Sequence, residues 1–197
     1  MARKQAPDFE QRRDAILEHA ARLYAAQGFL GASVADLARA CKTSKSLIYH
    51  YYPSNEDILF DVMHSHVRAL LEAAERVAAQ PLAPDAKLHA LTQEFMRLYV
   101  GAASRHKVLL NELARLPPKR REMVVQTQRR LIAIVEEILA AVRPSLAAGM
   151  IRPAAMLYFG MINWTHTWLD PSGAVEPQRI AALAADIILN GIAGRSA

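Results

Sequence analysis

Residues 33–59 read SVADLARACKTSKSLIYHYYPSNEDIL, and this stretch decides the fold of the N-terminal part of the chain. It contains two short helical patterns that are separated by a tight polar break. The second pattern opens with small polar residues and a lysine, and it ends in the consecutive rings of residues 49–52. A short helix of this composition suits the major groove of DNA, because it brings hydrogen-bonding groups to base edges and phosphates.

Capping signatures mark where the helices of this stretch begin. Ser33 with Asp36 forms a capping box that opens the first helix. The second helix begins near Ser44. Ser54 with Asp57 forms another capping box directly after the aromatic run, and it opens a long helix that continues to about residue 79.

The rest of the chain also has apolar residues at helical spacing, and strand alternation is absent. The sequence therefore predicts an all-α protein of about nine helices. By composition alone, the clearest boundary lies at the prolines at positions 81 and 84. The remaining expected helices cover roughly residues 8–26, 85–101, 104–116, 120–142, 153–169 and 177–191.

Composition narrows the class of protein. A chain of 197 residues with 52% hydrophobic residues can form one domain, or two small ones, with a sizeable core. Residues 1–52 hold eight Lys/Arg and five Asp/Glu, a balance of +3, whereas the other 145 residues hold sixteen and fourteen, a balance of +2. Positive charge is thus concentrated in the first quarter, which fits an anionic partner there.

Several classes of protein are disfavoured by what the sequence lacks. Cys41 is the single cysteine, so a disulfide framework is excluded, and without a signal peptide or long apolar run we expect a cytoplasmic protein with no membrane partner. No Gly-rich phosphate loop, nucleophile elbow or metal-spaced Cys/His pair is present. His64 and His66 are two residues apart and do not share a helix face. We expect no catalytic residues, no metal site and no cofactor.

Residues 10–60 resemble the N-terminal domain of the TetR family of transcriptional repressors. The resemblance implies a three-helix helix-turn-helix DNA-binding domain over residues 1–53. It implies a six-helix ligand-binding and dimerisation domain over residues 54–197. The matching stretches are Ile16–Ala26, Gly28-Phe29, Ser33–Ala38, Ser44-Lys45, Tyr49–Tyr52 and Ser54–Leu59.

The resemblance places the DNA contacts on the helix-turn-helix. Lys45 and Ser46 lie on the first turn of the reading helix, where base edges are reached, and Tyr49 and His50 lie one turn later. The alternative for these two rings is a place in the core, which we expect for Tyr52. The full set of expected DNA-binding residues is Ser33, Lys42, Thr43, Ser44, Lys45, Ser46, Tyr49, His50 and Asn55.

Three positions depart from the family pattern. Lys42 stands where a glycine is usual, so either the lysine adopts a left-handed conformation at a cost of roughly 1 kcal/mol or the turn differs. Ser46 replaces a small glycine and could contribute specificity. Asn55 replaces a lysine at the start of the fourth helix, which weakens one expected phosphate contact and lowers the salt dependence by about one unit of slope.

The resemblance also implies a homodimer joined by the last two helices. Paired reading helices must lie about 34 Å apart to enter successive major grooves, so the operator should be palindromic. The last two helices carry more apolar residues than one packing layer needs. The expected dimer-interface residues are Trp164, Trp168, Ile180, Leu183, Ile187 and Ile188.

A ligand pocket is expected among the middle helices. Each candidate lining residue also fits an ordinary place in the core, and Asn163, which lies between two apolar residues, equally fits a dimer-interface amide. The candidate ligand-binding residues are Met63, His66, Phe95, Tyr99, Leu110, Met123, Gln126, Arg130, Tyr158 and Asn163.

One segment indicates a class of ligand. Residues 160–168, GMINWTHTW, are similar to a segment of TetR-family members that sense acyl-CoA thioesters. A basic cluster around the seventh helix could meet coenzyme A phosphates, or it could be a solvated helical face. This cluster consists of Lys119, Arg120, Arg121, Arg129 and Arg130.

Taken with the resemblance, these features predict a repressor that a small-molecule inducer, with an acyl-CoA thioester as the indicated class, releases from DNA. The alternative is a helix-turn-helix activator or architectural protein without ligand control. The long helical C-terminal part disfavours this alternative, because DNA binding and dimerisation need far less chain.

Overall fold

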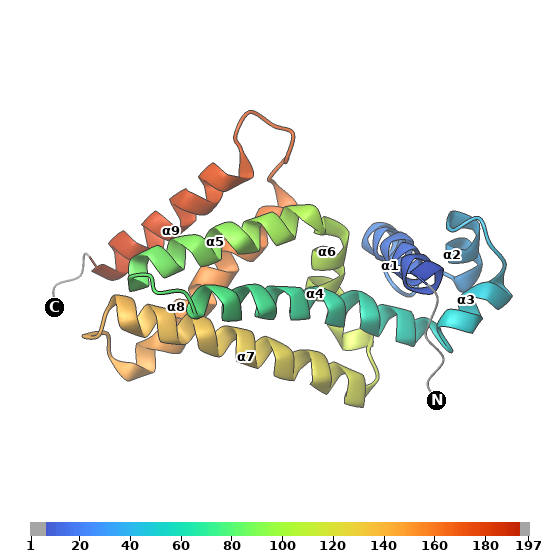
Figure 1. The fold of residues 1–197 in the computed structure, drawn as a ribbon, viewed down its shortest axis with the longest axis horizontal. Coiled ribbons are helices and arrows are strands. Elements are labelled where there is room, and N and C mark those ends of the chain that lie inside the picture. Colours follow the sequence, from blue (N-terminus) through green and yellow to red (C-terminus); the bar gives the residue numbers. More distant parts are fainter. Residues whose placement is uncertain (1–6, 194–197) are drawn as a thin grey trace. The chain divides into compact units, whose positions relative to one another are not determined.

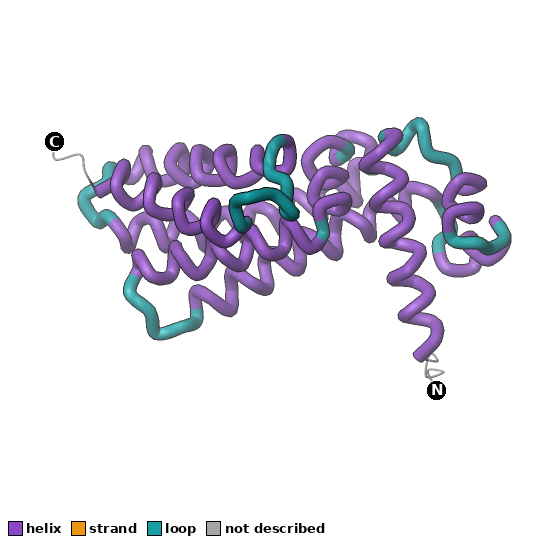
Figure 2. The backbone as a smooth tube through the Cα atoms, turned by 90° about the horizontal axis from the view of Figure 1, so that it is seen from above, coloured by secondary structure: helices purple, strands orange, loops and turns teal. Residues whose placement is uncertain are grey.

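The computed structural model describes residues 7–193, and within this range the backbone forms helices and loops without strands (Figures 1 and 2). The α-helices carry the labels of Figure 1, and two short 3₁₀ helices, η1 and η2, follow α6 and α8. In chain order the elements are α1 (Pro7–Gln27), α2 (Val34–Ala40), α3 (Lys45–Tyr51), α4 (Asn55–Ala78), α5 (Pro84–Gly101), α6 (Ala103–Asn111), η1 (Leu113–Arg115), α7 (Pro118–Val142), α8 (Ala148–Asn163), η2 (Trp164–Thr167) and α9 (Pro177–Ala193).

The predicted all-helical architecture is confirmed, but two helix bounds were wrong. Pro153 lies inside α8 and does not begin it. Pro153 lies beyond the first turn of α8, so it lacks the N–H that would otherwise donate to the Gly149 carbonyl oxygen. The Met150 N–H donates to the Ala147 carbonyl oxygen at 2.8 Å, which tightens the turn before the proline. The predicted helix over residues 104–116 is instead α6 followed by η1.

The chain packs as two compact units. Unit 1 comprises the described residues up to Val67 together with Ser104–Val125, and unit 2 comprises Arg68–Ala103 and the described residues from Gln126 onward. The packing therefore does not divide at residue 53, the predicted functional boundary, nor at the prolines at 81 and 84. The reason is that the first half of α4, and Val108 and Leu109 of α6, bury apolar side chains in the same core as α1.

The core of unit 1 supports the helix-turn-helix. Leu37 of α2 and Ile48 of α3 are fully buried, and they belong to one apolar cluster with residues of α1 and α4. Burying a side chain of this size contributes about 1.5–3 kcal/mol. The rings of Tyr24 and Phe29 meet edge to face with centroids 5.4 Å apart, which fixes the chain as it leaves α1.

The core of unit 2 is formed by α5, α8, α9 and the later parts of α4 and α7. Phe95 of α5 and Tyr158 of α8 are fully buried within it. Figure 1 shows α9 beside the first part of α5, and these two helices pack against each other.

No helix in the described part of the chain is long and apolar enough to cross a lipid bilayer.

Candidate nucleic-acid interface and sensor core

The start of α2 is fixed by the predicted capping box. The Ser33 hydroxyl donates to Asp36 Oδ2 at 2.5 Å, and it accepts a hydrogen bond from the Asp36 backbone N–H at 3.2 Å. The Ser33 backbone N–H also donates to Asp36 Oδ2, at 3.1 Å. These bonds from Ser33, followed by the nearby Arg39, hold the pKa of the Asp36 carboxyl below its ordinary value. The hydroxyl of Ser33 thus has a capping role within the chain.

The turn between α2 and α3 contains a lysine in a left-handed conformation. Lys42 has a φ of 52°, so of the two possibilities for this departure from the family pattern, the strained backbone is the one found. The Thr43 N–H donates to the Ala38 carbonyl oxygen at 2.9 Å, and this bond closes the turn. The side chain of Lys42 is exposed next to the start of α3.

Helix α3 presents a polar face to solvent. Ser44 caps it by accepting a hydrogen bond from the Leu47 N–H at 3.2 Å. Lys45 and Ser46 are exposed, and 49% of the Tyr49 side chain is exposed, which argues against a core position for this ring. Among the nine predicted contact residues, two are half-buried, Thr43 and Asn55, and seven are exposed, namely Ser33, Lys42, Ser44, Lys45, Ser46, Tyr49 and His50.

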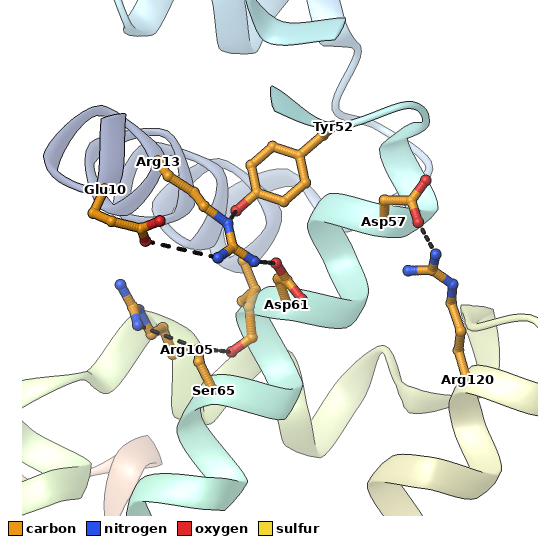
Figure 3. Close-up of polar contacts among 9 residues, drawn as sticks. Glu10, Arg13, Tyr52, Asp57, Asp61, Ser65, Arg105 and Arg120 are labelled. Atoms are coloured by element: carbon orange, nitrogen blue, oxygen red, sulfur yellow. Dashed lines mark hydrogen bonds and ion pairs between the residues drawn. The ribbon is translucent and has the colours of Figure 1, made fainter. Parts of the chain in front are cut away.

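The inner face of α3 is tied to its neighbours by polar contacts that the sequence analysis missed (Figure 3). Tyr52 is buried, as expected, and the Arg13 Nε donates to its hydroxyl at 3.1 Å. The same guanidinium pairs with Asp61 of α4 and lies 5.7 Å from the centroid of the Tyr52 ring. Arg13 therefore links α1, the end of α3 and α4.

A second arginine contacts the beginning of α4. The Ser54 hydroxyl donates to Asp57 Oδ2 at 2.6 Å and accepts from the Asp57 N–H at 3.1 Å, as the capping signature predicts. Asp57 also pairs with Arg120, whose guanidinium lies 5.0 Å from the centroid of the Phe60 ring (Figure 3). Arg120 was expected either to meet a ligand phosphate or to be solvated. It is instead bound within unit 1.

Asn55, which we expected to face a DNA phosphate, is held by partners within the chain. The Tyr24 hydroxyl donates to its Oδ1 at 2.5 Å, and its Nδ2 donates to the Ala32 carbonyl oxygen at 3.3 Å. A neutral amide accepts and donates at once, whereas the lysine that is usual here would only donate. Asn55 therefore has a structural role within the chain, which we did not expect from the sequence.

The candidate ligand-binding residues do not form a single cluster. Met63 and His66 are buried in unit 1, Leu110 is half-buried there, and Met123 is 44% exposed. In unit 2, Gln126 and Arg130 are exposed, and Arg130 pairs with Glu75 at 2.8 Å. The core of unit 2 contains Phe95, Tyr99 and Tyr158, all buried, and near the end of α8 lies Asn163, whose Oδ1 is buried without a hydrogen-bond partner.

Unit 1 contains a buried pair of histidines. His66 Nε2 of α4 lies 3.2 Å from His106 Nδ1 of α6, and both side chains are almost completely buried. The pKa of His66 is lowered to about 4, first because burial disfavours the charged ring and then because Arg105 is nearby. His66 is therefore neutral at neutral pH, so one ring of the pair can donate to the other.

The core of unit 2 combines a buried polar contact with stacked aromatic rings. The hydroxyl groups of Tyr158 and Thr92 are 3.0 Å apart, and the Thr92 hydroxyl also donates to the Leu88 carbonyl oxygen at 2.7 Å. Burial raises the pKa of Tyr158 above its ordinary value, so this group is a neutral phenol. The ring of Phe95 stacks on those of Tyr99 and Phe159, with centroids 6.2 and 6.1 Å apart.

Large apolar side chains are exposed on the last two helices and the segment between them. Trp164 is 65% exposed, Leu183 is 55% exposed and Ile187 is 53% exposed, and Trp168 is also exposed. Of the other expected interface residues, Ile180 and Ile188 are half-buried, and Ile188 packs on the core of its own unit. We call the exposed set, which also contains Leu157, the α8–α9 apolar residues.

Two family models match the chain. Residues 16–62 match the model described as bacterial regulatory proteins, tetR family. Residues 81–192, more than half of the chain, match the model of the tetracyclin repressor-like C-terminal domain. The chain belongs to the TetR family. The resemblance noted in the sequence is thereby confirmed.

Solved structures of other TetR-family proteins have the same fold. A TetR-family transcriptional regulator from Bordetella parapertussis 12822 is 37% identical with a TM-score of 0.88, over 94% of this chain and 97% of that one. The structure of AibR in complex with isovaleryl coenzyme A and operator DNA is 25% identical with a TM-score of 0.77, over 91% of this chain and 97% of that one.

One relative of the chain is named as a transcriptional repressor. The HTH-type transcriptional repressor KstR2 of Mycolicibacterium smegmatis is 24% identical over 192 residues, which cover 92% of this chain and 90% of that protein. These TetR-family relatives are transcriptional regulators and not enzymes. In the described part of this TetR-family chain, no three His, Cys, Asp or Glu side chains are grouped so that they could hold a metal ion.

Proposed function

We propose that this TetR-family protein is a repressor that binds a palindromic operator as a homodimer through the exposed face of α3. The observation that carries the proposal is the polar outer face of this helix, with Lys45, Ser46 and Tyr49 exposed while Ile48 is buried. Lys45 and Ser46 would meet base edges, and Tyr49 and the exposed turn would meet phosphates. Arg13 supports this arrangement from behind, because it holds Tyr52 at the end of α3.

The DNA contacts are tested by a gel-shift titration of the operator with Lys45→Ala and Tyr49→Ala. Each variant should lose operator binding while its unfolding transition stays within about 0.5 kcal/mol of the parent, since both residues are surface positions. Glu94→Ala, a surface substitution on α5, is the control and should bind the operator like the parent. Unchanged affinity in both variants would contradict the proposed role of α3.

We further infer that the inducer is an acyl-CoA thioester. Support comes from the residues 160–168 and from the similar AibR structure, which contains isovaleryl coenzyme A and operator DNA. In unit 2, the buried Asn163 Oδ1 still lacks a donor, which suits a polar ligand group. A ligand that releases DNA must bind the DNA-incompetent state more tightly than the DNA-bound state.

The ligand proposal is tested by a thermal-shift screen of CoA thioesters with different acyl chains. A thioester present at about a hundred times its Kd should stabilise the protein by about 2.7 kcal/mol, and it should release operator in the gel shift. Free coenzyme A is the matched control for binding through the nucleotide alone. If no thioester raises the melting temperature, the acyl-CoA proposal is wrong and the operator proposal still stands.

A further inference from the structure

Unit 1 has a groove between α1 and the turn that leads into α3. Its volume is about 260 Å³. The groove is separate from the buried histidine pair and from the ligand candidates of both units, because it contains none of those residues. Its lining residues are Arg12, Ala15, Ile16 and His19 of α1, Cys41, Lys42 and Thr43 of the turn, and Leu47 and Tyr51 of α3.

The groove combines an apolar wall with a basic rim. Ile16 and Leu47 contribute aliphatic surface, and Arg12 and Lys42 are exposed cations at its edge. Among the described residues that line it, none is acidic. A bare phosphate would match only the rim, whereas a carboxylate with a short hydrocarbon chain would match both the rim and the wall.

The size of the groove limits the ligand. Pockets for drug-sized ligands have volumes of roughly 300–1,000 Å³, so a groove of about 260 Å³ suits a molecule at or below that lower limit. A medium-chain carboxylate such as octanoate meets this condition. A CoA thioester is far larger, which separates this groove from the proposed inducer site.

We propose that this groove is a second ligand site, which binds a small amphipathic carboxylate with its anionic end at Arg12 and Lys42 and its chain along Ile16 and Leu47. The bound carboxylate neutralises Lys42, in the turn next to the reading helix. Its binding therefore opposes DNA binding, and this consequence rests on the proposed function of α3. The binding itself does not.

Cys41 provides a direct readout, because it lines the groove and is the single cysteine of the chain. Burial raises the pKa of its thiol, so alkylation by iodoacetamide is best followed by mass spectrometry near pH 9, where more thiolate is present. Octanoate at about ten times its Kd should slow this reaction about tenfold, in the absence of DNA. Octanol, which has the same chain without the charge, should give no comparable protection.

Matched variants of α1 locate the effect. Ala15 lines the groove and is exposed, and Ala26 is an exposed alanine of the same helix outside the groove. Ala15→Leu narrows the groove and should abolish the protection of Cys41, whereas Ala26→Leu should preserve it. The inference is overturned if octanoate gives no protection, if octanol protects equally, or if Ala15→Leu is protected like the parent.

A gel shift tests the link to DNA and separates the two ligand sites. Octanoate should weaken operator binding by the parent and by Ala26→Leu but not by Ala15→Leu. Release by a CoA thioester should be the same in all three proteins. If octanoate protects Cys41 but does not weaken operator binding, the proposed effect of this ligand on DNA binding is refuted. If the parent protein binds no operator at all, the proposed function fails, and the alkylation experiment still tests whether the groove binds a carboxylate.

Discussion

Arg13 of α1 donates a hydrogen bond to the hydroxyl of Tyr52 at 3.1 Å, although the two residues are 39 positions apart in the chain. The same arginine pairs with Asp61, so one side chain holds the end of α3 against both α1 and α4. Tyr52 is buried, and its hydroxyl therefore depends on this partner. The orientation of the exposed face of α3 follows from a contact on its inner side.

The first prediction concerns this contact. Tyr52→Phe should lower the free energy of unfolding by about 1.5–3 kcal/mol, because it removes one hydrogen bond to a charged donor and keeps the ring. Urea denaturation followed by circular dichroism measures the change. Tyr49→Phe removes a hydroxyl from an exposed ring of the same helix and should leave the stability unchanged. If both variants lose the same free energy of unfolding, the contact between Arg13 and Tyr52 has no specific stabilising effect.

The second prediction concerns the left-handed backbone of Lys42. Lys42→Gly relieves a strain of roughly 1–2 kcal/mol and costs about 0.5–1 kcal/mol of chain entropy, so a net gain of up to about 1.5 kcal/mol in stability is expected. Lys42→Ala is the matched control, since it removes the same charge and keeps the strain. Thermal unfolding of the two variants should therefore place glycine above alanine. The reverse order would mean that the turn is not strained at this residue.

Lys42 also has an expected effect on DNA affinity. Both variants lose one cation beside the reading helix, so the slope of log affinity against log salt should fall by about one unit in each. Gel-shift titrations at several salt concentrations measure this slope. An unchanged slope in both variants would place Lys42 away from the DNA phosphates.

The third prediction is a loss of stability in mild acid. His66 has a folded-state pKa of about 4 and an unfolded value of about 6.5, so between these values the unfolded chain binds more protons. The stability from neutral His66 is therefore complete above pH 6.5 and falls as the pH drops toward 4. Between pH 7.5 and 5 the expected loss is about 2 kcal/mol.

His66→Gln tests this pH dependence, because glutamine keeps a polar side chain beside His106 but does not titrate. Urea denaturation of the parent and the variant at pH 7.5 and 5 gives the comparison. The variant should start less stable at pH 7.5 and should lose less stability on acidification. Parallel losses in both proteins would show that another group controls the acid sensitivity.

The fourth prediction concerns the α8–α9 apolar residues. Leu183 is 55% exposed in the single chain, so a glutamate there costs the isolated chain little but would place a buried charge in the proposed dimer interface. Leu183→Glu should therefore give a monomer by size-exclusion chromatography with light scattering. Leu82→Glu, at a 40% exposed leucine in the loop before α5, is the matched control and should stay dimeric. A dimeric Leu183→Glu would move the interface to another surface.

Local sequence signals predicted the helices and their caps. Ser33 and Asp36 are three residues apart, so the bond between them can be inferred from the sequence alone. The family resemblance of the helix-turn-helix stretch predicted which residues of α3 are exposed. Contacts between distant segments could not be inferred in this way. Asp61 is 48 positions from Arg13 and Tyr24 is 31 positions from Asn55, and no local pattern marks such pairs.

It was also hard to predict from the sequence which side of the last helix packs on its own unit. Small residues surround much of α9, so the sequence does not show which side packs on its own unit. Ile187 and Ile188 are adjacent, yet the first is exposed and the second packs on the core. That difference depends on how α9 packs against α5 and α8, which local sequence does not reveal.

Because residues 104–125 belong to unit 1, they affect how a DNA-binding domain can be exchanged between related proteins. Val108, Leu109 and Leu116 are buried in the same cluster as α1 and α4. A chimera made by grafting only the first 53 residues would leave these side chains facing a foreign surface, and each mismatched or emptied site of this kind costs several kcal/mol. A transplant that retains the parent's specificity and folding should therefore carry two separate stretches, one ending near Val67 and one spanning Ser104–Val125.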